Sequence, residues 1–390
     1  MPIRELADCD VIAWRELSAH VLETNPLFEP ECLIPAAKIL PNGEEMSLVI
    51  ADDGGKFYGC FPVIVVAGID EMVSAIPGLR RRAFTTQVRR LRYDLTPLIR
   101  NERGAEAATA LLRVLTSRQS ANRAGILVLE AMDDGGPVAE VLRGAAKVLK
   151  LPVRTYRTWE RPILRRRDEM TYLENHSREH LKGFEKKRRR LGELLAGEVR
   201  LVDRSSDISA IDELIAMEAS GYKAKTGVAL VSHPGEPEWL KDMCDQFRER
   251  NRVLLYSLQV GEIVVAMHLM IRAGDGLFGL QIVYNEEYSK FSPGILLDLD
   301  VIEGFHKMTS AQWLDSCTYE GNETFLRFYP DRRQVSTVLV GVGGPMDRMF
   351  VRLYTVALTV FGVHSGFRRE HHWLFAGIDW VASKVKRPTS

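Results

Sequence analysis

The pattern of apolar and polar positions occurs twice along the chain. The apolar runs 47–50 and 56–66 flank the turn Asp52-Asp53-Gly54-Gly55, and the runs 253–260 and 263–271 flank the turn Gly261-Glu262. Apolar, β-rich runs separated by a short turn with glycine predict β-hairpins. We therefore expect two hairpins, about 200 residues apart.

The segments around each hairpin follow the same order. Helical patterns precede both hairpins, and a strand, a helix and a further strand follow each of them. A strand that feeds a crossover helix and then a parallel strand is typical of α/β architecture. The order predicts a duplicated unit, although the residues are not repeated, and one large sheet with coincidental repetition is the alternative. The predicted helices are 11–21, 31–40, 105–117, 177–195, 208–222, 238–249 and 293–307, and the predicted flanking strands are 91–99, 125–130, 277–284 and 312–316.

Length and charge narrow the class of protein. A chain of 390 residues exceeds what one hydrophobic core usually serves, so we expect two domains. The formal net charge is zero, which argues against a general nucleic-acid binder. Five cysteines without a CxxC pair favour a reducing compartment over a disulfide framework or a zinc site.

The two ends of the chain bear on location. The N-terminus lacks the apolar core of a signal peptide, and the late apolar stretch 353–363 is shorter than the roughly 20 residues that span a bilayer. We therefore expect a cytoplasmic protein. We expect the region beyond residue 345 to be a basic helical appendage that could touch a membrane surface.

The segment 284–297 carries the most informative candidate chemistry. Ser292 is a good N-cap residue, Pro293 suits the first helical position, and Gly294 leaves the first turn uncovered. The free N–H groups and positive dipole of a helix N-terminus can hold a phosphate, and Lys290 would add a full charge. An ordinary capped helix is the alternative interpretation.

Several motifs in order resemble the CelD/BcsL-type acetyltransferases of the GNAT superfamily, which are tandem-GNAT proteins related in fold to the Fem peptidyltransferases. The resemblance covers roughly residues 15 to 340. The motifs are Asn25-Pro26-Leu27-Phe28-Glu29-Pro30-Glu31, Gly59-Cys60-Phe61-Pro62-Val63, the basic run 184–191, and Tyr284, Tyr288 and Ser292-Pro293-Gly294-Ile295-Leu296-Leu297.

One block departs from the family pattern. The family often has an Asp followed by G-D-E-x-Y-K, whereas here Asp315 is followed by Gly321-Asn322-Glu323-Thr324-Phe325-Leu326. Arg327, one place later, is a substitute for the usual lysine. The departure bears on acceptor specificity and on activity.

The resemblance implies an α/β (α+β) fold of two tandem GNAT-like domains, each a mixed sheet flanked by helices. We expect an N-terminal domain over 1–165, a C-terminal domain over 166–345 that holds the donor site, and the appendage over 346–390.

The resemblance also implies acyl transfer from acyl-CoA without a metal. The thioester must be held near the acceptor, its carbonyl polarised and a proton removed from the nucleophile. Backbone amides of the strand 277–284 would polarise the carbonyl. The expected catalytic residues are Asp315 as base, with Glu320 and Glu323 as alternates, and Tyr284 as proton donor. The expected coenzyme-binding residues are Lys290, Ser292, Gly294 and Ile295, and the expected acceptor-binding residues are Tyr288, Glu323 and Arg327.

The basic run from Lys182 to Arg190 is the densest charge cluster. It is either a solvated helix face or a binding surface for an anionic acceptor or RNA, with Lys187 and Arg188 as contacts. His268, inside an apolar run, favours a core histidine over a catalyst. His176 and His180 have no evident third partner, so we expect no metal site.

Three functions remain open. The first is an N- or O-acetyltransferase acting on a small-molecule, polysaccharide, envelope or lipid-linked acceptor. The second is a Fem-like transferase that uses aminoacyl-tRNA. The third is a non-catalytic binding protein that retains the GNAT fold.

Overall fold

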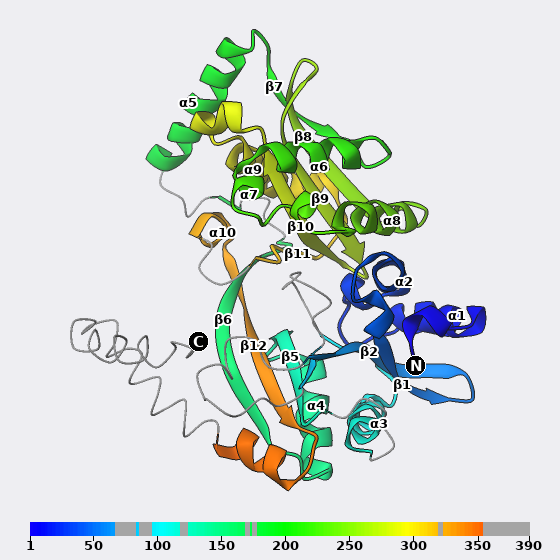
Figure 1. Cartoon of the computed structure of the whole chain (residues 1–390). Helices are drawn as coiled ribbons and strands as arrows, with labels where there is room; N and C mark the ends of the chain where they lie inside the picture. Colours follow the sequence, from blue (N-terminus) through cyan, green and yellow to red (C-terminus); the bar gives the residue numbers. More distant parts are fainter. Residues whose placement is uncertain are drawn as a thin grey trace, which may run out of the picture.

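The computed structural model describes residues 1–66, 83–85, 96–117, 124–167, 172–173, 178–318 and 323–353. It is a mixed α/β fold in which helices flank a sheet that runs through both halves of the molecule (Figure 1). The hydrogen-bonded strand order is β1-β2-β3-β5-β12-β6-β11-β10-β9-β8-β7. The long strands β6 (Val153–Arg165) and β12 (Asp331–Gly341) lie side by side at its centre.

The first half contains the hairpin at the position that the sequence predicts. Its helices are α1 (Asp8–Ser18), α2 (Pro30–Ile39), α3 (Gly104–Thr116) and α4 (Pro137–Val148). Its strands before β6 are β1 (Ser47–Asp53), β2 (Lys56–Val66), β3 (Ala83–Thr85), β4 (Leu98–Ile99) and β5 (Ile126–Asp133).

The second half contains the other predicted hairpin and the predicted crossover helix. Its helices are α5 (Arg178–Leu194), α6 (Ala210–Ser220), α7 (Tyr222–Lys225), α8 (Glu236–Arg248), α9 (Pro293–Met308) and α10 (Glu323–Phe328). Its strands before β12 are β7 (Val199–Asp203), β8 (Val253–Val260), β9 (Ile263–Ala273), β10 (Gly276–Tyr284) and β11 (Trp313–Asp315).

The pairing pattern of the two halves is the same. In the first half β1–β2 and β2–β3 are antiparallel and β3–β5 is parallel. In the second half β8–β9 and β9–β10 are antiparallel and β10–β11 is parallel. The sheet is continuous, as in the alternative interpretation, but its strand order repeats about the central β12–β6 pair, as the duplication predicts.

The last long strand of each half completes the sheet of the other half. β12 inserts between β5 and β6, and β6 inserts between β12 and β11, with antiparallel pairing throughout. Residues 162–165, where the sequence places the domain boundary, belong to β6. The two units therefore share their central strands.

Helices α2 and α8 also join the two units (Figure 1). The indole of Trp239 donates to the carbonyl of Cys32 at 3.1 Å, and Arg252 makes two hydrogen bonds with the buried carboxylate of Glu29. Glu31, also buried, pairs with Arg250 at 2.8 Å. The motif Asn25–Glu31, which carries part of the family resemblance, thus forms the contact between the units.

Two apolar cores lie on opposite faces of the second half's sheet. One includes residues of α6, α8 and the first unit, so it runs between the units. The other packs α9, α5 and the end of α10 against β8, β9 and β10. Polar groups that lie between β10 and α9 are therefore removed from bulk water. No described helix is long and apolar enough to cross a bilayer.

Candidate functional site

A pocket of about 630 Å³ opens where β10 and β11 part. The two strands pair in parallel only from Gly276–Phe278 to Trp313–Asp315, and β10 then carries a bulge between Gly279 and Gln281. Residues from the end of β10, the start of α9, the segment after β11 and the end of α6 line the pocket. A cleft between parallel strands, next to the N-terminus of a helix, can take an extended ligand with an anionic end.

The start of α9 forms one wall of this pocket. Ser292, Pro293, Gly294 and Ile295 all line it. A β-carbon added at Gly294 would lie 3.4 Å from the Tyr284 ring and 3.5 Å from the Ile282 side chain, so a methyl group fits there in ordinary contact. Pro293 occupies the first helical position, as the sequence predicts.

Ser292 occupies the N-cap position of α9, as the sequence predicts, but its side chain does not cap the helix. Ser292 adopts a left-handed conformation with φ 55°, and its side chain makes no capping hydrogen bond. Its hydroxyl instead accepts a hydrogen bond from the ammonium group of Lys187, at 2.7 Å. The cation beside the first turn of α9 is therefore Lys187, which comes from α5.

Three other predicted basic residues lie elsewhere. Lys290 is exposed, sits over the Phe291 ring at 5.0 Å and does not line the pocket. Arg188 binds Asp300 and the carbonyl of Leu296, so it fastens α5 to α9. Arg327 is exposed on α10 and is not part of the pocket wall.

Asp315 is fully buried at the end of β11 and does not line the pocket. It pairs with Arg161 at 3.4 Å and Arg333 at 3.1 Å, and it accepts the N–H of Cys317 at 2.7 Å. Burial alone would raise the pKa of Asp315, but the two guanidinium charges and this hydrogen bond hold it below its usual value. A carboxylate stabilised in this way is a weak proton acceptor.

The remaining predicted residues divide between the pocket and its surroundings. Tyr284 lines the pocket, whereas Tyr288 packs against the nearby core. Glu323 begins α10, but its side chain is outside what the structure describes, and Glu320 lies outside the described residues. Phe325, from the block that departs from the resembled pattern, is part of the pocket wall.

Two buried polar residues of the pocket wall were not predicted as functional. His268 on β9 was expected in the core; it is 2% exposed, burial lowers its pKa to about 3, and Nδ1 has no hydrogen-bond partner among the described residues. Asp298 on α9 is also 2% exposed, and burial raises its pKa to about 7. The signal available in the sequence was an acidic residue flanked on both sides by leucine, at Leu297 and Leu299.

The opposite wall of the pocket contains a satisfied polar cluster. Glu218, at the end of α6, accepts hydrogen bonds from Lys223 at 3.1 Å, from the N–H of Leu230 at 2.9 Å and from Gln281. These contacts fix α6 and α7 against the outer part of β10. Among the described residues, no group of three or more His, Cys, Asp and Glu side chains could hold a metal ion.

A comparison with known protein families finds a match in the second half of the chain. The family model described as an acetyltransferase (GNAT) domain matches residues 178–325. This part of the chain is therefore similar to GNAT-type acetyltransferase domains. The match includes the pocket wall from α6 to Phe325 and the Lys187 helix, but it does not cover β6 or β12.

Solved structures share the fold over most of the chain. FemX is 11% identical, with a TM-score of 0.50, and the match covers 85% of this chain and 95% of that chain. A conserved protein of unknown function from Bacteroides thetaiotaomicron VPI-5482 is 7% identical, with a TM-score of 0.53 and coverage of 85% and 96%. At such identities the likeness shows the fold alone. No curated protein matches the chain.

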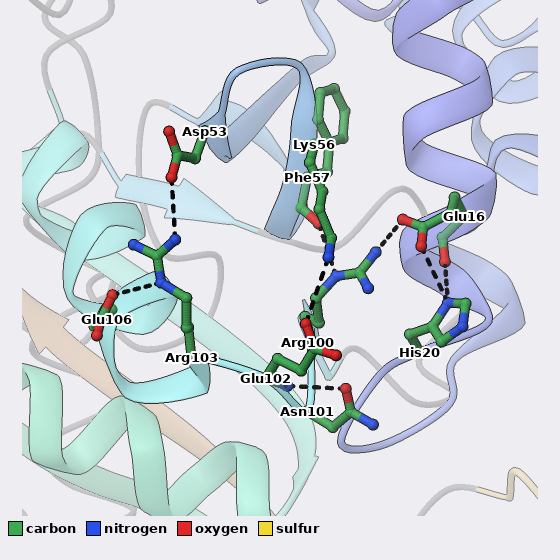
Figure 2. Close-up of polar contacts among 10 residues, drawn as sticks. All are labelled: Glu16, His20, Asp53, Lys56, Phe57, Arg100, Asn101, Glu102, Arg103 and Glu106. Atoms are coloured by element: carbon green, nitrogen blue, oxygen red, sulfur yellow. Dashed lines mark hydrogen bonds and ion pairs between the residues drawn. The ribbon is translucent and has the colours of Figure 1, made fainter.

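In the first unit, the helix that corresponds to α9 is α3, and its start is built differently (Figure 2). Arg103, like Ser292, is a left-handed residue at the N-cap, with φ 57°. Its side chain pairs with Glu106 and Asp53 of the same unit, at 2.7 Å and 3.1 Å. The side chain of Leu22 would lie 3.1 Å from a β-carbon on Gly104, so the space over this first turn is filled.

The other cations drawn in Figure 2 are paired in the same way. The buried guanidinium of Arg100 binds Glu16 and the carbonyl of Phe57. Lys56 pairs with Glu102 at 3.4 Å. The start of α3 is therefore neutralised by acidic side chains of its own unit, whereas the start of α9 faces a pocket.

Proposed function

We propose that the protein is an acyltransferase that moves an acyl group, in the simplest case acetyl, from acyl-CoA to an amine or a hydroxyl. The observation that carries the proposal is the pocket at the parting of β10 and β11, with Gly294 and the Lys187–Ser292 pair at its edge. Backbone N–H groups of a helix start, together with one ammonium group, suit a pyrophosphate. The internally paired start of α3 supports a single donor site, in the second unit.

The chain's own groups supply the rest of the chemistry. The parted strands leave room for the arm of the coenzyme, and backbone N–H groups of β10 would polarise the thioester carbonyl. Tyr284 stands beside Gly294 in the pocket wall, where its hydroxyl can serve the leaving thiolate. The wall formed by Glu218 and Lys223 is the side from which we propose that the acceptor enters.

The acceptor and the cell compartment are part of the same proposal. We propose a polysaccharide, envelope or lipid-linked acceptor, reached with help from the basic region over 346–390, most of which lies outside the described residues. All five cysteines are free, which fits a cytoplasmic protein. We also retain the division at residue 165 as a proposal, with each unit's sheet completed by the other.

A second donor is supported by one feature of α5. Lys182, Lys186 and Arg190 are exposed at i, i+4 and i+8, so they form a basic stripe on the helix that carries Lys187. A polyanionic donor such as aminoacyl-tRNA would use this stripe as well as the start of α9. RNA that copurifies with the protein and is lost from a Lys182→Ala/Lys186→Ala/Arg190→Ala variant would favour this donor.

The test of the donor site is titration calorimetry with acetyl-CoA. We expect Lys187→Ala to weaken binding about tenfold or more, because a charge-assisted contact contributes roughly 1.5–3 kcal/mol. Lys186→Ala, one residue away but exposed, is the matched control. Gly294→Ala should bind nearly normally, because the methyl group makes ordinary contacts, and Gly294→Leu should not, since the larger side chain would extend over the first turn of α9 into the pocket.

The outcomes separate the alternatives. Normal binding by both Lys187→Ala and Gly294→Leu, with unchanged melting curves, would place the donor site elsewhere. Binding of acetyl-CoA without release of free thiol, whatever the acceptor offered, would favour a non-catalytic binding protein.

A further inference from the structure

Asp298 lies one helical turn beyond Gly294 on the same face of α9, and both line the pocket. Its side chain is 2% exposed. Oδ1 accepts a hydrogen bond from the hydroxyl of Tyr329 at 3.0 Å, while Oδ2 has no hydrogen-bond partner in the described structure. A buried carboxyl group with one unsatisfied oxygen destabilises the fold, and such groups are concentrated at functional sites.

Few charges act on this carboxyl group. Burial raises its pKa to about 7, and only the Tyr329 hydrogen bond works in the opposite direction. Titratable groups on the elements around it include His268 on β9, Tyr284 on β10, Tyr256 on β8, Cys317 after β11, Lys187 on α5, Glu303 on α9, and the Arg188–Asp300 pair between α5 and α9. The members of that pair neutralise each other.

The other titratable groups near the reacting centre are poorer proton acceptors. His268 has its pKa lowered to about 3, so it is a weak base. Asp315 is held ionised by two arginines, and Glu218 accepts hydrogen bonds from three donors. A general base works best when its pKa lies near the operating pH, and Asp298 is the described pocket residue that meets this condition.

We propose that Asp298 accepts the proton of the nucleophile during acyl transfer, with Tyr329 as the residue that orients it. The inference rests on the proposed function. As the amine or hydroxyl attacks, its bond to the carbonyl carbon forms, its proton passes to Oδ2 and the carbon–sulfur bond breaks. Coenzyme A leaves as the thiolate and takes up that proton, so Asp298 returns to its ionised form.

The experiment compares wild type, Asp298→Asn and Glu303→Gln across pH. Asparagine keeps the acceptor for Tyr329 but cannot take up a proton; Glu303 is an exposed carboxylate on the same helix and serves as control. The assay follows thiol release from acetyl-CoA with water or glucosamine as acceptor, and calorimetry measures acetyl-CoA binding. Asp298→Asn should lower the rate by about 10²–10⁴. It should also remove the rise in rate near pH 7 and leave the Kd for acetyl-CoA within about twofold, as expected for a group whose loss affects only the transition state.

Each result decides a different point. A folded Asp298→Asn variant with the wild-type rate and pH profile would overturn the role of Asp298 and leave the donor site intact. A wild type that does not bind acetyl-CoA would overturn the proposed function itself. Tyr329→Phe should shift the rate profile to higher pH, since the hydrogen bond that lowers the pKa of Asp298 is lost; a merely structural carboxyl group would show no such shift.

Discussion

Asp298→Asn should change the pH dependence of stability. The pKa of Asp298 is about 7 in the folded protein and about 3.8 in the unfolded chain. Between these values the folded state holds a proton that the unfolded state does not, so wild-type stability falls as pH rises from about 4 to about 7. A difference of about three pKa units, at 1.36 kcal/mol each, corresponds to about 4 kcal/mol as an upper bound.

The asparagine side chain does not titrate, so the free energy of unfolding of the variant does not fall over this pH range. Near pH 5 Asp298 is still protonated in the folded protein but already ionised in the unfolded chain, so the variant should have only about a third of its full stability advantage there, roughly 1.2 of about three pKa units. At pH 8.5 the variant should be more stable by about 1–4 kcal/mol, since relaxation around a buried charge reduces the upper bound. Active-site substitutions that stabilise the fold at the expense of activity are a known trade-off.

The assay is urea unfolding at both pH values, with the slope of the free energy against urea checked for constancy. Glu262→Gln is the control, because Glu262 is exposed in the turn between β8 and β9 and should contribute little. An equal difference between wild type and Asp298→Asn at pH 5 and pH 8.5 would refute the reasoning. It would mean that the carboxyl group is ionised at both values.

Two further predictions concern the packing of the fold. Glu29→Ala removes the carboxylate that binds Arg252 twice between the units, and it should lower the free energy of unfolding by about 3–5 kcal/mol in the same assay; a loss below 1 kcal/mol would contradict the view that this contact joins the units. A β-carbon on Gly276 would lie 2.1 Å from the Trp313 ring, so Gly276→Ala should lower the melting temperature steeply. The double variant Gly276→Ala/Trp313→Ala should recover part of that loss, because the clashing ring is removed. Additive effects of the two changes on the melting temperature would contradict this clash.

Much of the fold could be predicted because its signals are local. Glycine turns and alternating apolar runs place both hairpins, and the proline at position 293 marks the start of α9. The predicted order of elements recurs in the structure with the pairing pattern of a duplicated unit. β6 and β12 were not predicted, because a strand buried between distant partners depends on contacts that no local pattern contains.

The candidate site, like the fold, could be predicted only where its signals are local. The open first turn at Gly294 follows from turn chemistry, so the sequence indicates it. The cation beside that turn does not follow, because Lys187 comes from a helix about 100 residues earlier in the chain. Asp315 has the position expected of a base, but Arg161 and Arg333 approach it from β6 and β12 and change its chemistry. Asp298 resembles an ordinary helix residue until packing shows that it is buried.

The exchange of β6 and β12 has a consequence for synthesis on the ribosome. The sheet of the N-terminal half lacks its inner strand until residues 331–341 have emerged from the ribosome. This half therefore cannot complete its sheet before residue 341 has been synthesised. Fragments cut near residue 165 would each expose the edge of a strand that the other fragment should cover. The shared strands also oppose a hinge between the halves, because bending there would break the β12–β6 ladder. Among the described residues, the pocket of the second half is lined by that half alone, so a ligand can reach it without any movement between the halves.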